Sequence, residues 1–94
     1  MNKYENVVII NPSLEEEKIK ELIKKVSSLI NKDGKVIEVN ELGKKKLAYE
    51  IKKNQEGYYI VIKFEAKPSL ITELERIYRI ADEVIKFIVV KEDE

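Results

Sequence analysis

Three consecutive lysines follow a glycine near the middle of the chain, within residues 43–53. Lysine side chains that cluster in this way can contact the phosphates of a nucleic acid through their ammonium groups. Because a glycine inside an extended run is typical of a bend or bulge, we expect Lys44, Lys45 and Lys46 at a bend in a strand. The alternative is that these lysines only protect an exposed strand against pairing with another chain. The residues alone leave both interpretations open.

The composition argues against catalysis. The chain has no histidine and no cysteine, so neither the usual zinc sites nor Ser-His and Cys-His nucleophile pairs can form. Its three glycines are too few for a glycine-rich phosphate loop. We therefore expect no catalytic residue, no metal site, no cofactor and no small-molecule substrate.

The charge balance limits how the chain can bind a nucleic acid. Eighteen basic and eighteen acidic side chains give a net charge of zero, so bulk attraction to phosphates is not expected. A local basic patch that acts together with a basic partner remains compatible with this balance.

The length predicts one domain that spans residues 1–94. No stretch approaches the ~20 apolar residues that cross a membrane, and residues 1–6 lack the apolar core of a signal peptide. The absence of cysteine suits a reducing compartment. We therefore expect a cytoplasmic protein without membrane contact.

The first half of the chain predicts a strand, a helix and a long extended segment. Residues 4–10 become apolar on both faces, as in a central strand. Ser13 and Glu16 match a capping box before an amphipathic helix that ends at residues 33–34. Residues 35–53 would span roughly 60 Å if fully extended, which is too long for so small a domain. We therefore expect this segment to bend and to project from the body.

The second half predicts a hairpin partner, a second helix and a last strand. Residues 54–57 are predicted to form the hairpin connection, with Gly57 providing a positive φ. In the strand that follows, residues 58–66, alternate side chains form a buried face. A helix from Leu70 to about residue 82 and a strand over residues 84–90 follow. Residues 91–94 form an acidic end that we expect to be frayed.

This order of elements predicts an α+β fold, the ferredoxin-like βαββαβ sandwich. Its four-stranded, mostly antiparallel sheet carries two helices on one face, with the first and third strands central. Side chains expected in the core include Leu47, Tyr49, Ile51, Tyr58 and Phe64. The other sheet face is open, and its candidates for contact with a partner are Tyr4, Tyr59, Val61 and Lys63.

Further cations are candidates for phosphate contact. Lys3 and Lys86 are expected on neighbouring strands, where they would form one small basic patch. Arg79 lies at the end of the second helix, beside the last strand. Lys52 and Lys53 fit equally well an ordinary charged hairpin.

The fold alone decides little about function. An acylphosphatase-like enzyme would need an arginine after the first strand, and residues 11–14 contain none. In an RNA-recognition motif the third strand carries several aromatic residues. Residues 56–63 match the glycine and the first aromatic of that pattern but not the later ones. An interaction module that uses a sheet edge or the open face remains.

Residues 41–51, Glu-Leu-Gly-Lys-Lys-Lys-Leu-Ala-Tyr-Glu-Ile, resemble the signature of the bacterial small-subunit ribosomal protein six family. The similarity extends through Tyr4-Glu5, Asn11-Pro12, Gly57-Tyr58, residues 79–82 and residues 89–91, and so covers the whole chain. Glu50 stands where family members often have proline.

The resemblance implies a structural protein of the ribosome. It would join the central domain of small-subunit ribosomal RNA as a heterodimer with the small, basic ribosomal protein eighteen. That partnership agrees with the neutral charge of this chain. The alternative function is a ferredoxin-like interaction or regulatory module without an RNA role.

Overall fold

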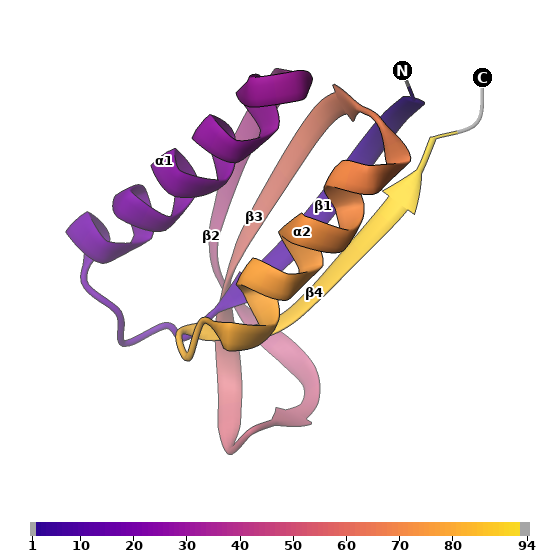
Figure 1. Cartoon of the computed structure of the whole chain (residues 1–94). Coiled ribbons are helices and arrows are strands. Elements are labelled where there is room, and N and C mark those ends of the chain that lie inside the picture. The colour runs from indigo at the N-terminus through magenta and orange to yellow at the C-terminus, as the bar shows by residue number, and fades with distance from the viewer. Residues whose placement is uncertain (1, 93–94) are drawn as a thin grey trace.

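The computed structural model describes residues 2–92 and has the predicted order of elements. Four strands form one sheet in the order β2-β3-β1-β4, and every neighbouring pair is antiparallel. The two helices pack on one face of this sheet (Figure 1). The prediction that the first and third strands are central is therefore confirmed. The elements are β1 (Asn2–Ile10), α1 (Glu16–Asp33), β2 (Lys35–Ile51), β3 (Asn54–Ala66), α2 (Pro68–Ile80) and β4 (Val84–Lys91).

The main core lies between the sheet and the helices. On the two central strands, cross-strand partners such as Val8 with Ile60 and Tyr4 with Phe64 point to the helix side. The buried face predicted for β3 is confirmed: Ile60, Ile62, Phe64 and Ala66 are buried, and Tyr58 packs against the core. The helices contribute Ile19, Leu22, Val26, Ile30, Leu70, Leu74 and Tyr78.

One polar side chain, Asn6, is fully buried within this core. Its Nδ2 donates a hydrogen bond to the backbone carbonyl of Ile88 at 2.9 Å. Its Oδ1 accepts a hydrogen bond from the hydroxyl of Tyr78. Burial raises the pKa of Tyr78 well above its usual value. The amide therefore links β1 to β4 and to α2 without leaving an unpaired polar group.

The start of α1 differs from the predicted capping box. Ser13 does not cap the helix, because its hydroxyl and its backbone N–H both donate to Oδ1 of Asn11, at 2.7 and 3.0 Å. Asn11 thus forms a local turn directly after β1. The helix begins later, with Glu15 at the N-cap and no side-chain cap. Its end at Asp33, followed by Gly34, is as predicted.

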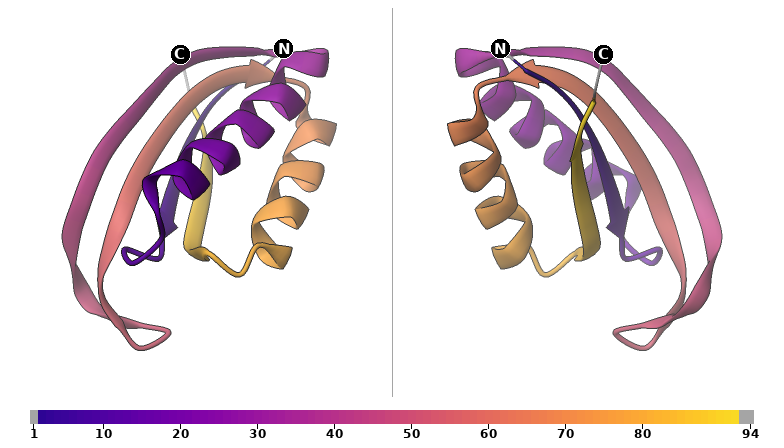
Figure 2. Two further views of the ribbon diagram at one scale, coloured as in Figure 1. Left: turned by 90° about the vertical axis from the view of Figure 1, so that its left-hand side faces the viewer. Right: turned by 90° about the vertical axis from the view of Figure 1, so that its right-hand side faces the viewer.

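The long strand β2 bends at Gly43, which has a φ of +84°. The pairing with β3 shifts between Glu41 and Gly43, as expected of a bulge. Beyond this bend the outer half of the β2–β3 hairpin extends past the rest of the sheet (Figure 1), and its tip bends to one side (Figure 2). The predicted projection is confirmed.

The hairpin turn is not at residues 54–57. It is a two-residue turn at Lys52 and Lys53, whose φ angles are +48° and +66°, while Ile51 pairs with Asn54. Gly57 lies inside β3, where an added Cβ would come 2.3 Å from the side chain of Ile9. The glycine is therefore needed for close packing and not for the turn.

A second, smaller cluster lies on the sheet face opposite the helices. Ile9, Leu47 and Ile85 are each 7% exposed, and Ile51 and Tyr59 pack against them. Leu47 is therefore buried, as predicted, but not in the main core. The prediction for Tyr49 is wrong: it lies outside this cluster, and 63% of its surface is exposed.

The end of the chain is paired further than expected. Lys91 is the last residue of β4, and the backbone N–H of Glu92 donates to the carbonyl of Lys3 at 2.9 Å. Residues 93–94, the rest of the predicted frayed end, lie outside the described residues. Within residues 2–92 no helix is both long and apolar enough to cross a membrane.

Replacing Lys52-Lys53 by Asn-Gly should stabilise the protein by about 1 kcal/mol or more. Left-handed backbone costs an ordinary L-residue about 1–2 kcal/mol, and Asn-Gly is the preferred pair for such a turn. Urea unfolding measures the gain. The control is Lys52→Gln with Lys53→Gln, which removes the same charges but keeps a Cβ at both positions. An equal gain in the control would assign the effect to charge instead of backbone strain.

Tyr78→Phe should lower the free energy of unfolding by about 1–3 kcal/mol, because Asn6 loses a buried hydrogen bond. It should also change the alkaline pH dependence. Unfolded tyrosine releases its proton near pH 10, whereas folded Tyr78, with its raised pKa, keeps it. Stability contributed by Tyr78 is therefore present below pH 10 and lost above it, by about 1.4 kcal/mol per pH unit.

Urea unfolding of both proteins between pH 8 and 11 tests this effect. The decline in stability above pH 10 should be shallower in the phenylalanine variant by about that amount. Equal slopes for wild type and Tyr78→Phe would contradict the assignment.

Candidate nucleic-acid interface

Three cations from three different elements line one hollow at the hairpin end of the molecule. They are Lys52 of the turn, Arg79 in the last turn of α2, and Lys86 of β4. The hollow has a volume of about 320 Å³, and its other lining residues are Tyr78, Val84, Ile85 and Phe87. Sequence reasoning did not separate Lys52 from Lys53, because only the bend of the hairpin distinguishes them.

Few contacts neutralise these cations. The Nζ of Lys52 donates to the carbonyl of Val84 at 3.5 Å. The Nζ of Lys86 donates to the hydroxyl of Tyr49 at 3.3 Å. Within residues 2–92, the only carboxylate within 4 Å of the three cations is Glu75, whose Oε1 lies 3.9 Å from Nη2 of Arg79. The hollow therefore has an excess of positive charge, which suits a phosphate group.

The three lysines after Gly43 are all exposed, but alternation divides them between the two faces. Lys45 lies opposite Gly57 and shares the open face. Lys44 lies opposite Tyr58, on the side where the helices pack. Because neighbouring lysines face opposite sides of the sheet, all three cannot contact the phosphates of one RNA backbone that lies along a single face.

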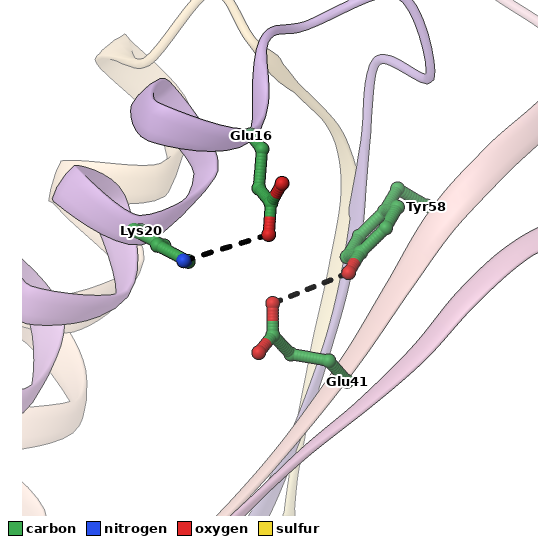
Figure 3. Close-up of polar contacts among 4 residues, drawn as sticks. All are labelled: Glu16, Lys20, Glu41 and Tyr58. Carbon is green, nitrogen blue, oxygen red and sulfur yellow. Dashed lines mark hydrogen bonds and ion pairs between the residues drawn. The ribbon is translucent and has the colours of Figure 1, made fainter.

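On the helix side, carboxylates of the hairpin and of α1 lie near each other (Figure 3). The hydroxyl of Tyr58 donates to Oε1 of Glu41 at 3.2 Å, and Glu16 pairs with Lys20 at 3.5 Å. Burial raises the pKa of Tyr58, and the negative charges of Glu41 and Glu16 raise it further. A phosphate is therefore less favoured here than at the hollow.

Lys3 and Lys86 do not form one patch. Lys86 lies opposite Ile9 on β1, six residues along that strand from Lys3, which is about 20 Å at 3.3 Å per residue. Lys3 lies opposite Glu65 of β3 instead. The prediction failed because the register of β4 is not encoded in either residue's local sequence.

Three of the four residues predicted to contact a partner are on the open face. Tyr59, Val61 and Lys63 are half-buried there. Tyr4 is not: it is 7% exposed and stacks on Phe64 in the main core, with ring centroids 5.5 Å apart. The prediction is wrong because Tyr4 is in phase with Asn6 and Val8 along β1.

The open face also has an apolar strip, of which the sequence analysis named only Val61. Val61, Val7 and Ile88 are successive cross-strand partners on β3, β1 and β4. Ile88 is 45% exposed, and Val90, two residues further along β4, is 54% exposed. The sequence did contain a signal for this strip, because β4 has apolar residues at both its odd and its even positions and therefore on both faces of the sheet. An exposed apolar strip of this kind is typical of a protein contact surface.

Comparisons with known proteins identify the family. The family model for ribosomal protein S6 matches residues 3–91. The chain belongs to this family. The small ribosomal subunit protein bS6 of Clostridium novyi is 52% identical over 91 residues and covers 96% of both chains. That of Clostridium kluyveri is 50% identical over 94 residues and covers 99% of both.

Solved structures agree on the fold. The crystal structure of 30S ribosomal protein S6 from Thermotoga maritima superposes with a TM-score of 0.90 at 36% identity, covering 97% of this chain and 87% of that one. An Arabidopsis thaliana protein with 18% identity and a TM-score of 0.58 shares the fold only. The predicted ferredoxin-like fold and family resemblance are confirmed. The S6-family chain is thus a protein of the small ribosomal subunit, in the cytoplasm.

Proposed function

We propose that the S6-family chain binds the central domain of small-subunit ribosomal RNA as a heterodimer with the basic ribosomal protein eighteen. The role is structural and not catalytic. The observation that carries this proposal is the division of the surface into a cationic hollow at the hairpin end and an exposed apolar strip on the open sheet face.

The neutral charge supports the need for a basic partner. The chain has a net charge of zero, so its affinity for RNA must come from a few local cations. A protein that makes only a few phosphate contacts binds weakly at physiological salt. A basic partner would add contacts along the same RNA, and both proteins would then bind as one unit.

We assign the two surfaces to the two partners. The apolar strip of Val61, Val7 and Ile88, flanked by Tyr59 and Lys63, contacts ribosomal protein eighteen. RNA contacts Arg79 and Lys86 at the hollow. Of Lys44, Lys45 and Lys46, it is Lys45, on the open face, that reaches a flanking phosphate. Lys3, opposite Glu65, is the weakest of the RNA candidates.

Filter binding to the central-domain RNA at physiological salt tests the proposal. The chain alone should bind weakly, and adding ribosomal protein eighteen should raise the affinity by orders of magnitude. Ile88→Asp should remove this gain, because a charge in the apolar strip opposes docking. The matched control is Ile80→Asp, an exposed isoleucine on α2 (69%) away from the open face. Equal affinity with and without the partner would refute the heterodimer.

Replacing Lys44, Lys45 and Lys46 by glutamine should reduce the salt dependence of RNA binding by the heterodimer. The slope of log K against log salt should fall by about 0.7–0.9 for each lysine that neutralises a phosphate. Folding should change by no more than about 0.5 kcal/mol, since all three side chains are exposed. Glutamine at Lys24, Lys25 and Lys32 of α1 removes the same charge as a control. An unchanged slope, with more aggregation, would instead assign the lysines to edge protection.

A further inference from the structure

The hairpin turn keeps two lysines in a backbone conformation that disfavours them. Both Lys52 and Lys53 have positive φ, where Asn-Gly would fit without strain. Strained backbone is retained mainly at functional sites. Only one of the two lysines lines the hollow, since Lys52 reaches Val84 at the α2–β4 junction. The turn therefore places a cation at a defined position.

An exposed aromatic ring stands beside the same hollow. Tyr49 lies in the irregular part of the hairpin, where four residues of β2 (47–50) face one residue of β3 (Gln55). The ring is 63% exposed. The Nζ of Lys86 lies 5.8 Å from its centroid and donates to its hydroxyl. One cation of the hollow therefore holds the ring in place.

The cations of the hollow and the exposed ring of Tyr49 together fit the phosphate and the base of one unpaired nucleotide. Bases of single-stranded RNA stack on aromatic rings, and the backbone follows a cationic groove. In a continuous A-form helix the base faces are hidden by stacking, so Tyr49 can only accept a base that is splayed out. At roughly 30 Å³ for each water molecule, the hollow of about 320 Å³ has room for a phosphate group and several waters.

We propose that Tyr49, Lys52, Arg79 and Lys86 form a binding site for a single unpaired nucleotide of RNA. Its base stacks on Tyr49, and its phosphate lies in the hollow among the three cations. This inference rests on the proposed function, because it names which form of RNA the cationic end accepts.

The first test is filter binding of the heterodimer to central-domain RNA. Tyr49→Ala should weaken binding by about 5- to 150-fold, the range found when one base stack is removed. Tyr49→Phe keeps the ring and should retain most of the affinity. Lys52→Gln should reduce the slope of log K against log salt by about 0.7.

Two matched controls come from the same elements. Lys53→Gln removes the neighbouring charge of the same turn, and Arg76→Gln removes the arginine one helical turn before Arg79. Neither residue lines the hollow, so both variants should have the salt slope of wild type. Urea midpoints should show that Tyr49→Ala remains folded, because this ring is exposed.

A second readout needs no partner. In ¹⁵N and ¹H NMR of the isolated chain, hexauridylate should shift the amides of residues 49, 52 and 79–86 and move the Tyr49 ring protons upfield. A 12-base-pair RNA duplex should leave those ring protons unchanged. Ring shifts with both RNAs, or with neither, would overturn the nucleotide site.

The outcomes separate the two proposals. If the wild-type heterodimer binds the RNA but Tyr49→Ala binds equally well, the nucleotide site is wrong and the proposed function stands. If the wild-type heterodimer does not bind, the proposed function fails, and the hexauridylate titration alone decides the nucleotide site.

Discussion

The buried amide of Asn6 makes the hydrogen bonds on which the arrangement of the cationic hollow depends. It donates to the carbonyl of Ile88 and accepts from the hydroxyl of Tyr78, so β4 and α2 are both fixed relative to β1. Any shift of either element would leave a buried polar group unpaired, which costs about 1–3 kcal/mol. Arg79 follows Tyr78 in the chain, and Lys86 is two residues before Ile88. The same two hydrogen bonds therefore bring both cations to one end of the sheet.

A net charge of zero conceals an uneven distribution of charge along the open face. At the end away from the hairpin, lysines lie opposite carboxylates, with Lys3 facing Glu65 and Lys63 facing Glu5. At the hairpin end, the cations of the hollow face mainly apolar residues and backbone. Strand register produces this separation, since it decides which charges are neighbours. A local basic surface at one end is thus compatible with a neutral chain.

The accuracy of most sequence predictions depended on the range of the interactions involved. The capping box at Ser13 and the face of Tyr4 are exceptions, because both are local features and both predictions were wrong. The order of elements, the central strands and the buried face of β3 follow from patterns within a few residues, and these were predicted correctly. Three predictions were wrong: the burial of Tyr49, the turn at Gly57, and the basic patch of Lys3 and Lys86. Each of these features depends on contacts between residues that are distant in sequence. Gly57 is set by the side chain of Ile9, and the position of Lys86 is set by its register with β1. Likewise, the hollow joins three elements and has no signature in any one of them.

The position of the hairpin tip depends on the small apolar cluster of the open face. Leu47 packs on Ile9 and Ile85, and this contact anchors the irregular segment that follows Lys46. Tyr49 follows two residues after Leu47, outside this cluster, where it stays exposed and accepts a hydrogen bond from Lys86. The strained turn then directs Lys52 toward Val84. The main core thus places Arg79 and Lys86, while the small cluster places Tyr49 and Lys52. Changes that loosen the small cluster should therefore displace Tyr49 and Lys52 before they unfold the protein.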